Sequence, residues 1–261
     1  MNKRTSTALL NIITFVAVSM LLVGFYGVRH SPAEHVERYR LVSSDGVASP
    51  SKEATSKSLG VCGANPCVAL TFDDGPGQYT AQLLEILKQY ETKATFFVVG
   101  EQVTRNPGLA RKIVRAGHQI GNHTWNHPDL SQMAPYAIKR ELDDTSAAIK
   151  QATGAMPTIM RPPYGALSPT ASREIGNAGM SSILWDVDTR DWADRNSTIV
   201  CNRAVANTQP GSIILMHDIH KTSVDAVPCI VNQLSKSGYK FVTVEELLGK
   251  TTPGVSYFSG S

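Results

Sequence analysis

The sequence predicts an α/β fold whose parallel strands form a barrel or an open sheet. From Cys67 onward, short β-rich runs alternate about seven times with stretches of helical periodicity. Unusual polar clusters follow the predicted strands. Strand–helix units in series give parallel strands joined by right-handed crossovers. No Gly-x-Gly-x-x-Gly sequence opens the first helix, which argues against a dinucleotide-binding fold.

Strands are predicted where β-branched and aromatic residues cluster, and helices where apolar residues recur every three to four positions. Gly154 is a C-cap signal, and Pro169 after Ser168 marks a helix start. The predicted strands are Val68–Phe72, Ala94–Val99, Gln119–Asn122, Thr158–Met160, Ser181–Val187, Ser212–Met216 and Tyr239–Val242. The predicted helices are Ala81–Tyr90, Asn106–Ala116, Tyr136–Thr153, Ser168–Ala178, Thr198–Asn207, Ser223–Ser237 and Val244–Leu248.

The chain has 261 residues, enough for one large domain with appendages. Its net charge of +3 is small and spread along the sequence. A nucleic-acid-binding protein would show a clustered basic stripe, and none is present in the sequence, so no nucleic-acid partner is predicted. We expect a monomer.

The N-terminal part predicts a membrane anchor. Ala8–Val28 is a run of 21 residues without a charged side chain, long enough to span a bilayer. It continues into Arg29 without a small-residue cleavage site, so residues 1–30 are predicted to be a cytoplasmic tip and an uncleaved signal-anchor transmembrane helix. Residues 31–60 contain seven serines and one aromatic residue, which is typical of a flexible linker. Residues 61–248 would form the large folded domain and residues 249–261 a polar C-terminal tail.

The four cysteines all follow the predicted span. An even number of cysteines in an exported domain indicates two disulfides, and the predicted pairs are Cys62–Cys67 and Cys201–Cys229. The alternative is buried free thiols. We therefore expect a single-pass protein of the cell membrane with its catalytic domain outside the cell.

Two adjacent carboxylates, Asp73 and Asp74, follow the first predicted strand, and Gly75–Pro76 then turns the chain. Like charges in a buried position repel each other unless a cation lies near them. His123 and His127 offer two closely spaced imidazoles. With Asp74 they would form the three-ligand set of a catalytic zinc, which leaves one position open. The alternative is a simple turn and two surface histidines.

Each polar cluster directly follows a predicted strand. In parallel α/β folds those positions share one rim, where active sites are built, whereas purely structural residues would be scattered over both rims. We therefore interpret the clusters as one active site. They are Asp73–Asp74, His123 with His127, Arg161–Gly165, Asp186–Trp192 and His217–Asp218.

Five segments resemble, in order, the five motifs of polysaccharide deacetylases, carbohydrate esterase family 4. The resemblance covers about Cys67 to Leu248, and no motif position departs from the pattern. It implies a distorted (β/α)7 barrel and a metal-dependent hydrolase that removes N-acetyl or O-acetyl groups. The segments are Thr71–Pro76, His123–His127, Arg161–Gly165, Asp191–Trp192 and Leu215–Asp218.

The family's residue roles are carried over onto the matching positions. Asp74, His123 and His127 would hold a divalent metal, for which these ligands permit zinc, cobalt or nickel. The metal would lower the pKa of water and polarise the acetyl carbonyl. Asp73 would be the general base, and Arg161 would pair with it and hold it ionised.

The remaining motif residues would act on the intermediate and the leaving group. The resemblance makes the backbone N–H of Tyr164 an oxyanion donor. His217 would protonate the departing sugar nitrogen, and Asp191 would favour the charged form of His217. Trp192 and Leu215 would form the apolar pocket for the acetyl methyl group, although each alone would be interpreted as a core residue.

Three functions stay open at this point. The expected one is removal of acetyl groups from N-acetylglucosamine in an exported polysaccharide, with peptidoglycan first and chitin-type oligomers next. An acetylxylan esterase would carry the same motifs, because they describe the acetyl site and not the sugars around it. A catalytically silent glycan-binding domain would be expected to lack Asp73 or His217, and both are present.

Overall fold

The computed structural model describes residue 62 and residues 65–260. The predicted anchor and linker, residues 1–30 and 31–60, lie outside this range. Within it, no helix is both long enough and apolar enough to cross a bilayer.

In the described part of the chain, nine strands form one sheet in the order β6-β7-β1-β2-β3-β4-β5-β9, with β8 paired to β1 beside this path. Every pair of strands in the ladder is parallel. This confirms the predicted parallel α/β arrangement. The strands are β1 Cys67–Asp73, β2 Thr95–Val98, β3 Gln119–Asn122, β4 Ile159–Met160, β5 Ser181–Ile183, β6 Val187–Asp188, β7 Ile213–His217, β8 Lys240–Val242 and β9 Ser256–Tyr257.

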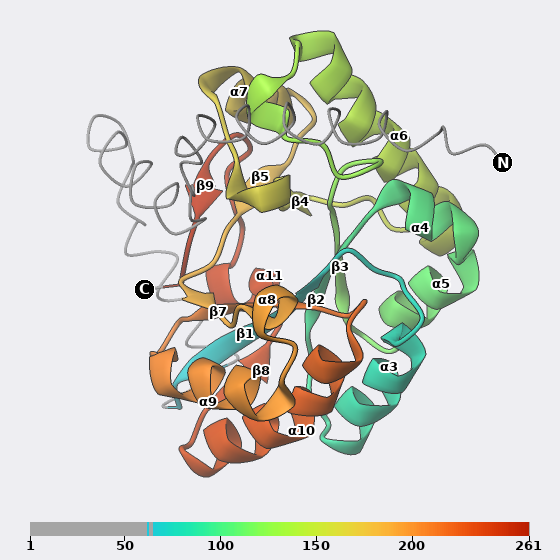
Figure 1. Ribbon diagram of the computed structural model, residues 1–261. Coiled ribbons are helices and arrows are strands. Elements are labelled where there is room, and N and C mark those ends of the chain that lie inside the picture. Colours follow the sequence, from blue (N-terminus) through green and yellow to red (C-terminus); the bar gives the residue numbers. More distant parts are fainter. Residues whose placement is uncertain (1–61, 63–64, 261) are drawn as a thin grey trace, which may run out of the picture.

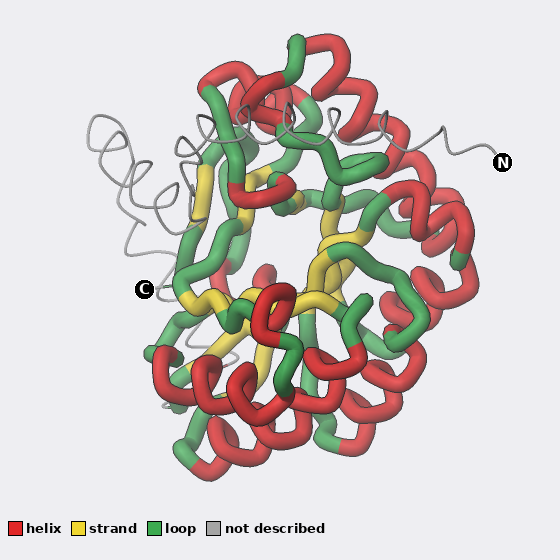
Figure 2. Tube along the Cα trace, viewed as in Figure 1, coloured by secondary structure: helices red, strands yellow, loops and turns green. Residues whose placement is uncertain are grey.

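The helices lie above, to the right of and below the strands in Figure 1, and Figure 2 shows the strands in yellow inside this arc of red helices. Two 3-10 turns, η1 Leu130–Gln132 and η2 Pro163–Gly165, follow β3 and β4. The short helix α4 directly after β2 was not predicted. The helices are α3 Thr80–Gln89, α4 Gly100–Arg105, α5 Pro107–Arg115, α6 Pro135–Thr153, α7 Pro169–Asn177, α8 Asp191–Asp194, α9 Ser197–Asn207, α10 Lys221–Lys236 and α11 Val244–Leu248.

The strand predicted at Ser181–Val187 is divided into β5 and β6, which pair with different neighbours. Between them, Leu184 N–H donates to Tyr257 O at 2.8 Å and Asp186 N–H donates to Ile213 O at 3.3 Å. The Asp186 carboxylate also accepts from Ile213 N–H at 2.7 Å, in place of a backbone carbonyl. β5 and β6 lie near opposite ends of the strand order, and residues 184–186 connect them without strand pairing in a continuous ladder. The barrel is therefore distorted.

Residues 249–260, interpreted from the sequence as a polar tail, include β9, which pairs with β5. Phe258 packs against a buried cluster that contains Leu167 and Met180. This segment therefore contributes to the sheet and to the core.

The core lies between the strands and the surrounding helices. All seven residues of β1 are buried, as expected for a parallel strand covered on both faces. Leu83 and Leu87 of α3 are fully buried against it, and each stabilises the fold by about 1.5–3 kcal/mol relative to exposure. Both predicted disulfides are present, and Cys201–Cys229 joins α9 to α10.

Candidate active site

The two acidic residues lie at the C-terminal rim of the sheet. Asp73 ends β1, and in the parallel ladder it lies opposite Phe97 of β2 and His217 of β7. Because the carboxyl ends of parallel strands meet at one edge, the polar segments that follow each strand converge beside Asp73 and Asp74.

Asp74, His123 and His127 form a compact ligand set. One ligand atom from each residue lies within 4.8 Å of the others, and the Nε2 atoms of both histidines are 3.4 Å from Asp74 Oδ1. His123 Nδ1 lies 2.7 Å from the carbonyl oxygen of Arg161. This contact selects the tautomer with the proton on Nδ1, which leaves the Nε2 lone pair free for a metal.

The environment of Asp74 and the donor atoms of the three residues suit a bound cation. Asp74 Oδ1 is buried, and among the described residues it has no hydrogen-bond partner, an arrangement that is costly unless an ion satisfies it. Burial acts to raise the pKa of Asp74, but the close interaction with His123 and the charges of neighbouring histidines hold it well below its usual range. One carboxylate oxygen and two imidazole nitrogens are a donor set that divalent zinc accepts.

Three residues of the site have left-handed backbone conformations that non-glycine residues rarely adopt. They are Asp74 at φ 73°, His127 at φ 65° and Tyr164 at φ 60°. Each such conformation costs of order 1–3 kcal/mol and persists only where its surroundings hold it. Such strain is concentrated at functional sites, so its presence at two members of the ligand set supports this location.

Arg161 is completely buried beneath the rim. Its Nη1 donates to Asp73 Oδ1 at 2.9 Å and to Thr71 Oγ1 at 2.7 Å. Its Nε and Nη2 donate to two backbone carbonyl oxygens, those of Ile183 and Leu184, at 3.0 Å each. The guanidinium is therefore fixed in place, and it orients the Asp73 carboxylate toward the cleft wall formed by the ligand set.

His217 and Asp191 form a second charged pair. His217 Nδ1 lies 2.8 Å from Asp191 Oδ1, and the fully buried Asp191 also accepts from His217 N–H at 2.8 Å. Burial alone would lower the pKa of His217, but the hydrogen bond and charge of Asp191 outweigh it and raise the pKa to about 9. His217 therefore carries a proton at neutral pH.

A cleft of about 310 Å³ joins these groups. The predicted substrate residues Tyr164, Trp192 and Leu215 line it together with both aspartates, both metal-ligand histidines and His217. Arg161 and Asp191 lie behind the lining and contact it through Asp73 and His217. The structure thus brings all ten predicted catalytic, substrate and metal residues together.

Four further residues that received no role from the sequence line the cleft, namely Pro162, Trp185, Asp188 and His220. Trp185 lies in the break between β5 and β6, Asp188 ends β6, and His220 precedes α10. Asp188 belongs to the polar cluster after the fifth predicted strand, and His220 lies three positions after His217. The sequence could therefore have indicated these cleft residues through their proximity to the recognised motifs.

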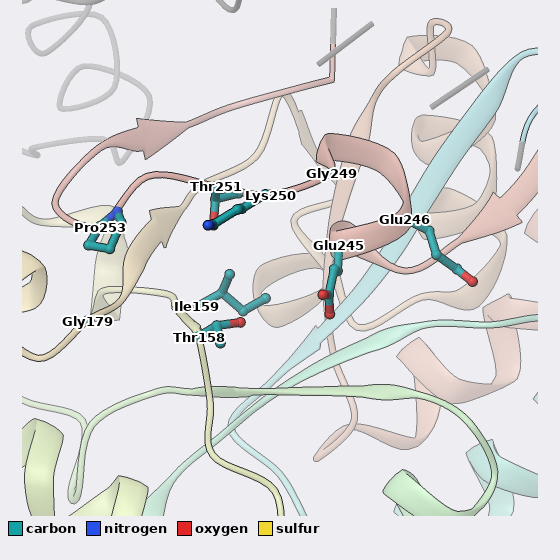
Figure 3. A pocket seen from close by; sticks show the side chains of 9 residues that line it. All are labelled: Thr158, Ile159, Gly179, Glu245, Glu246, Gly249, Lys250, Thr251 and Pro253. Carbon is teal, nitrogen blue, oxygen red and sulfur yellow. The ribbon is translucent and has the colours of Figure 1, made fainter. Parts of the chain in front are cut away.

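A second cavity of about 730 Å³ lies at the opposite ends of the strands (Figure 3). Its lining includes Thr158 before β4, Gly179 before β5, and Glu245 and Lys250 from α11 and the segment after it. The ligand set, Asp73 and His217 do not line it. The smaller cleft at the C-terminal rim is therefore the candidate active site.

Comparisons with known proteins identify the family of this chain. A model of the polysaccharide deacetylase family matches residues 60–183. The chain is 43% identical over 196 residues to peptidoglycan-N-acetylglucosamine deacetylase PgdA of Listeria monocytogenes, covering 74% of this chain and 41% of that protein. It is 32% identical to a peptidoglycan-N-acetylglucosamine deacetylase of Bacillus cereus, covering 90% and 91% of the two chains.

A solved structure described as T48 deacetylase with substrate is 45% identical and has a TM-score of 0.72, covering 75% of this chain and 98% of that one. The chain spans about two fifths of the length of the first curated relatives. The near-complete coverage of other relatives identifies the family directly. The chain belongs to the polysaccharide deacetylase family, carbohydrate esterase family 4, which is a family of hydrolases.

Proposed function

We propose that this protein is a metal-dependent hydrolase that removes acetyl groups from N-acetylglucosamine residues of an extracellular polysaccharide, and that this polysaccharide is peptidoglycan. The observation that carries the proposal is the buried, unpartnered Asp74 Oδ1 between two histidine nitrogens, in the same cleft as a base and an acid. The relatives from Listeria monocytogenes and Bacillus cereus, which are named for this substrate, support the choice of glycan.

Asp74, His123 and His127 would hold the ion, and zinc suits this ligand set, with cobalt or nickel as substitutes. The bound ion supplies Lewis acidity toward the acetyl carbonyl and lowers the pKa of water. His123 is aimed by its contact with the Arg161 carbonyl, which fixes the ring before the ion arrives.

The chain's own groups then divide the proton transfers. Asp73, oriented by Arg161 at 2.9 Å, takes a proton from the attacking water as general base. His217 donates a proton to the departing sugar nitrogen, and the Asp191 carboxylate keeps it charged until then. The backbone N–H of Tyr164 stabilises the oxyanion, and Trp192 and Leu215 contact the acetyl methyl group.

A silent glycan-binding domain is the competing function from another class. A fold alone does not determine activity, so the comparison rests on the site. A domain that only binds glycan does not need a buried His217–Asp191 pair and a separate Arg161–Asp73 pair beside one set of metal ligands. Both pairs are present here, which favours catalysis.

The test is acetate release by the full-length chain on peptidoglycan, chitooligosaccharide and acetylxylan, compared side by side with and without added zinc. The proposal expects metal-dependent release that is fastest on peptidoglycan. Fastest release from acetylxylan would instead assign an esterase. No release from any of the three substrates with zinc bound would favour the silent binding domain.

We also propose that Ala8–Val28 anchors the protein in the cell membrane with its catalytic domain outside. The length of the uncharged run supports this, as do two disulfides, which form in oxidising compartments. Fractionation of cells that express the chain should place it in the membrane. A soluble product that begins after Arg29 as the main form would contradict the anchor.

A further inference from the structure

Asp218 is a buried carboxylate that the proposed mechanism does not use. Asp73 and His217 are paired in the parallel ladder, so the residues after them, Asp74 and Asp218, leave the sheet from adjacent strands. Asp218 is fully buried. Its Oδ2 accepts a hydrogen bond from the Thr80 hydroxyl at 2.5 Å, whereas its Oδ1 is buried without a partner in the described part of the chain.

Thr80 connects this carboxylate to the loop that follows Asp74. The Thr80 hydroxyl oxygen accepts from Gly77 N–H at 2.7 Å, and Thr80 itself is fully buried. A single hydroxyl therefore joins the end of β7, through Asp218, to the turn between β1 and α3.

Gly75 lies directly against the same carboxyl group. A Cβ atom built on Gly75 would lie within 3.0 Å of its three nearest atoms, and all three belong to the Asp218 carboxyl group. Gly75 does not have a positive φ, so contact with Asp218, and not backbone conformation, excludes a side chain here. The absence of a side chain at Gly75, in the first motif, thus leaves room for the carboxyl group of Asp218, in the fifth motif.

We propose that Asp218 and Thr80 are positioning residues that hold the Asp74–Gly77 turn, and through it present the Asp74 carboxylate to the metal. The inference rests on the proposed metal site. Asp74 is held at φ 73°, a conformation that persists only when neighbouring contacts hold it. Groups that orient a metal ligand typically affect metal affinity by about 10- to 100-fold when they are removed.

Thr80→Val tests the hydroxyl, because valine keeps the shape and removes only the hydrogen bonds, and Thr80→Ser is the matched control that keeps them. Zinc affinity is measured on full-length protein by competition with a chromogenic chelator. We expect Thr80→Val to bind zinc about 10- to 100-fold more weakly and Thr80→Ser to bind it within about threefold of wild type. Equal affinities in Thr80→Val and wild type would overturn the inference.

A second control separates positioning from general loss of stability. Thr243 caps α11 through Glu246 N–H, and the adjacent Val244 N–H bonds Thr95 at the start of β2, at the opposite end of the strands from Asp74. Thr243→Val should lower the melting temperature of the metal-free protein and leave zinc affinity unchanged. An equal loss of zinc affinity in Thr243→Val would show that Thr80 acts only through stability, which would overturn the inference.

A double-mutant cycle tests the fit between Gly75 and Asp218 independently. Gly75→Ala and Asp218→Ala should each weaken zinc binding. The double variant should bind no more weakly than Asp218→Ala, because removing the carboxylate makes room for the new methyl group. Additive losses would contradict the proposed coupling. If the wild-type protein binds no divalent ion, the metal site itself is refuted. If wild type and Thr80→Val bind zinc equally well, only the positioning role is refuted.

Discussion

Replacing Asp191 by asparagine tests how His217, the proposed general acid, is kept protonated. The substitution preserves size but removes the charge and one acceptor from a carboxylate that bonds His217 through both Nδ1 and N–H. Without that charge, burial lowers the pKa of His217 and only the charges of Asp73 and Asp74 still oppose it, so the pKa falls from about 9 toward its ordinary value of 6.5. His217 would then lose its proton within the working pH range.

The size of the effect follows from the protonated fraction of His217. With a pKa of about 9, roughly nine tenths of the protein carries the proton at pH 8; with a pKa of about 6.5, only about 3% does, which is a loss of about 30-fold. At pH 6 the two fractions differ by only about 1.3-fold. The variant also orients the His217 ring less well, and the resulting loss of activity is the same at both pH values. The high-pH limb of activity should therefore shift to lower pH by about 2.5 pH units.

The assay is the initial rate of acetate release from N-acetylated glycan between pH 5 and pH 10, with zinc content checked in each sample. Asp191→Asn should lose about 20-fold more activity at pH 8 than at pH 6, relative to wild type. Equal losses at the two pH values would mean that Asp191 only orients the ring. A larger loss at low pH would refute the acid role of His217.

Three other substitutions separate the remaining roles. Asp74→Ala should lose bound metal, because two histidines rarely hold a catalytic ion alone; full metal content by mass spectrometry would transfer the ligand role to another residue. Asp73→Asn should keep the metal and lose about 10²- to 10⁴-fold in turnover, and unchanged turnover would exclude it as the base. His217→Ala should lose about 10²- to 10⁴-fold on N-acetylated glycan and much less on an activated aryl acetate, because a phenolate departs without protonation. Equal losses on the amide and the ester would instead assign His217 to the oxyanion or the metal site.

Most of the candidate site was predictable because one rule of parallel folds positions it. Residues directly after parallel strands share a rim, so short-range patterns in the sequence were enough to group Asp74 with His123 and His127. The ladder bears this out, since Asp73 pairs with His217 in register although 144 positions separate them in the sequence.

The features that were not predicted depend on contacts between distant segments. The break between β5 and β6 depends on the Asp186 carboxylate binding Ile213 N–H, 27 positions away, and local β propensity does not encode such a contact. The two-residue strand β9 exists because Ser256 and Tyr257 pair with β5. Trp185 lies in the same break, Asp188 ends β6, and His220 lies in the loop after β7. Their positions in the cleft therefore follow from tertiary structure.

Arg161 shows why fold and chemistry cannot be separated at this site. It follows β4, which is separated from β1 in the sheet by β2 and β3, yet its guanidinium bonds Thr71 and Asp73 of β1. The side chain therefore crosses the barrel interior, where it lies 4.3 Å from the centre of the Phe97 ring. Its other donors bind the Ile183 and Leu184 carbonyls at the end of β5, beside the break in the ladder. A lysine has no planar fork with which to make these bonds. The arginine that orients Asp73, the proposed base, therefore also links β1 to the end of β5.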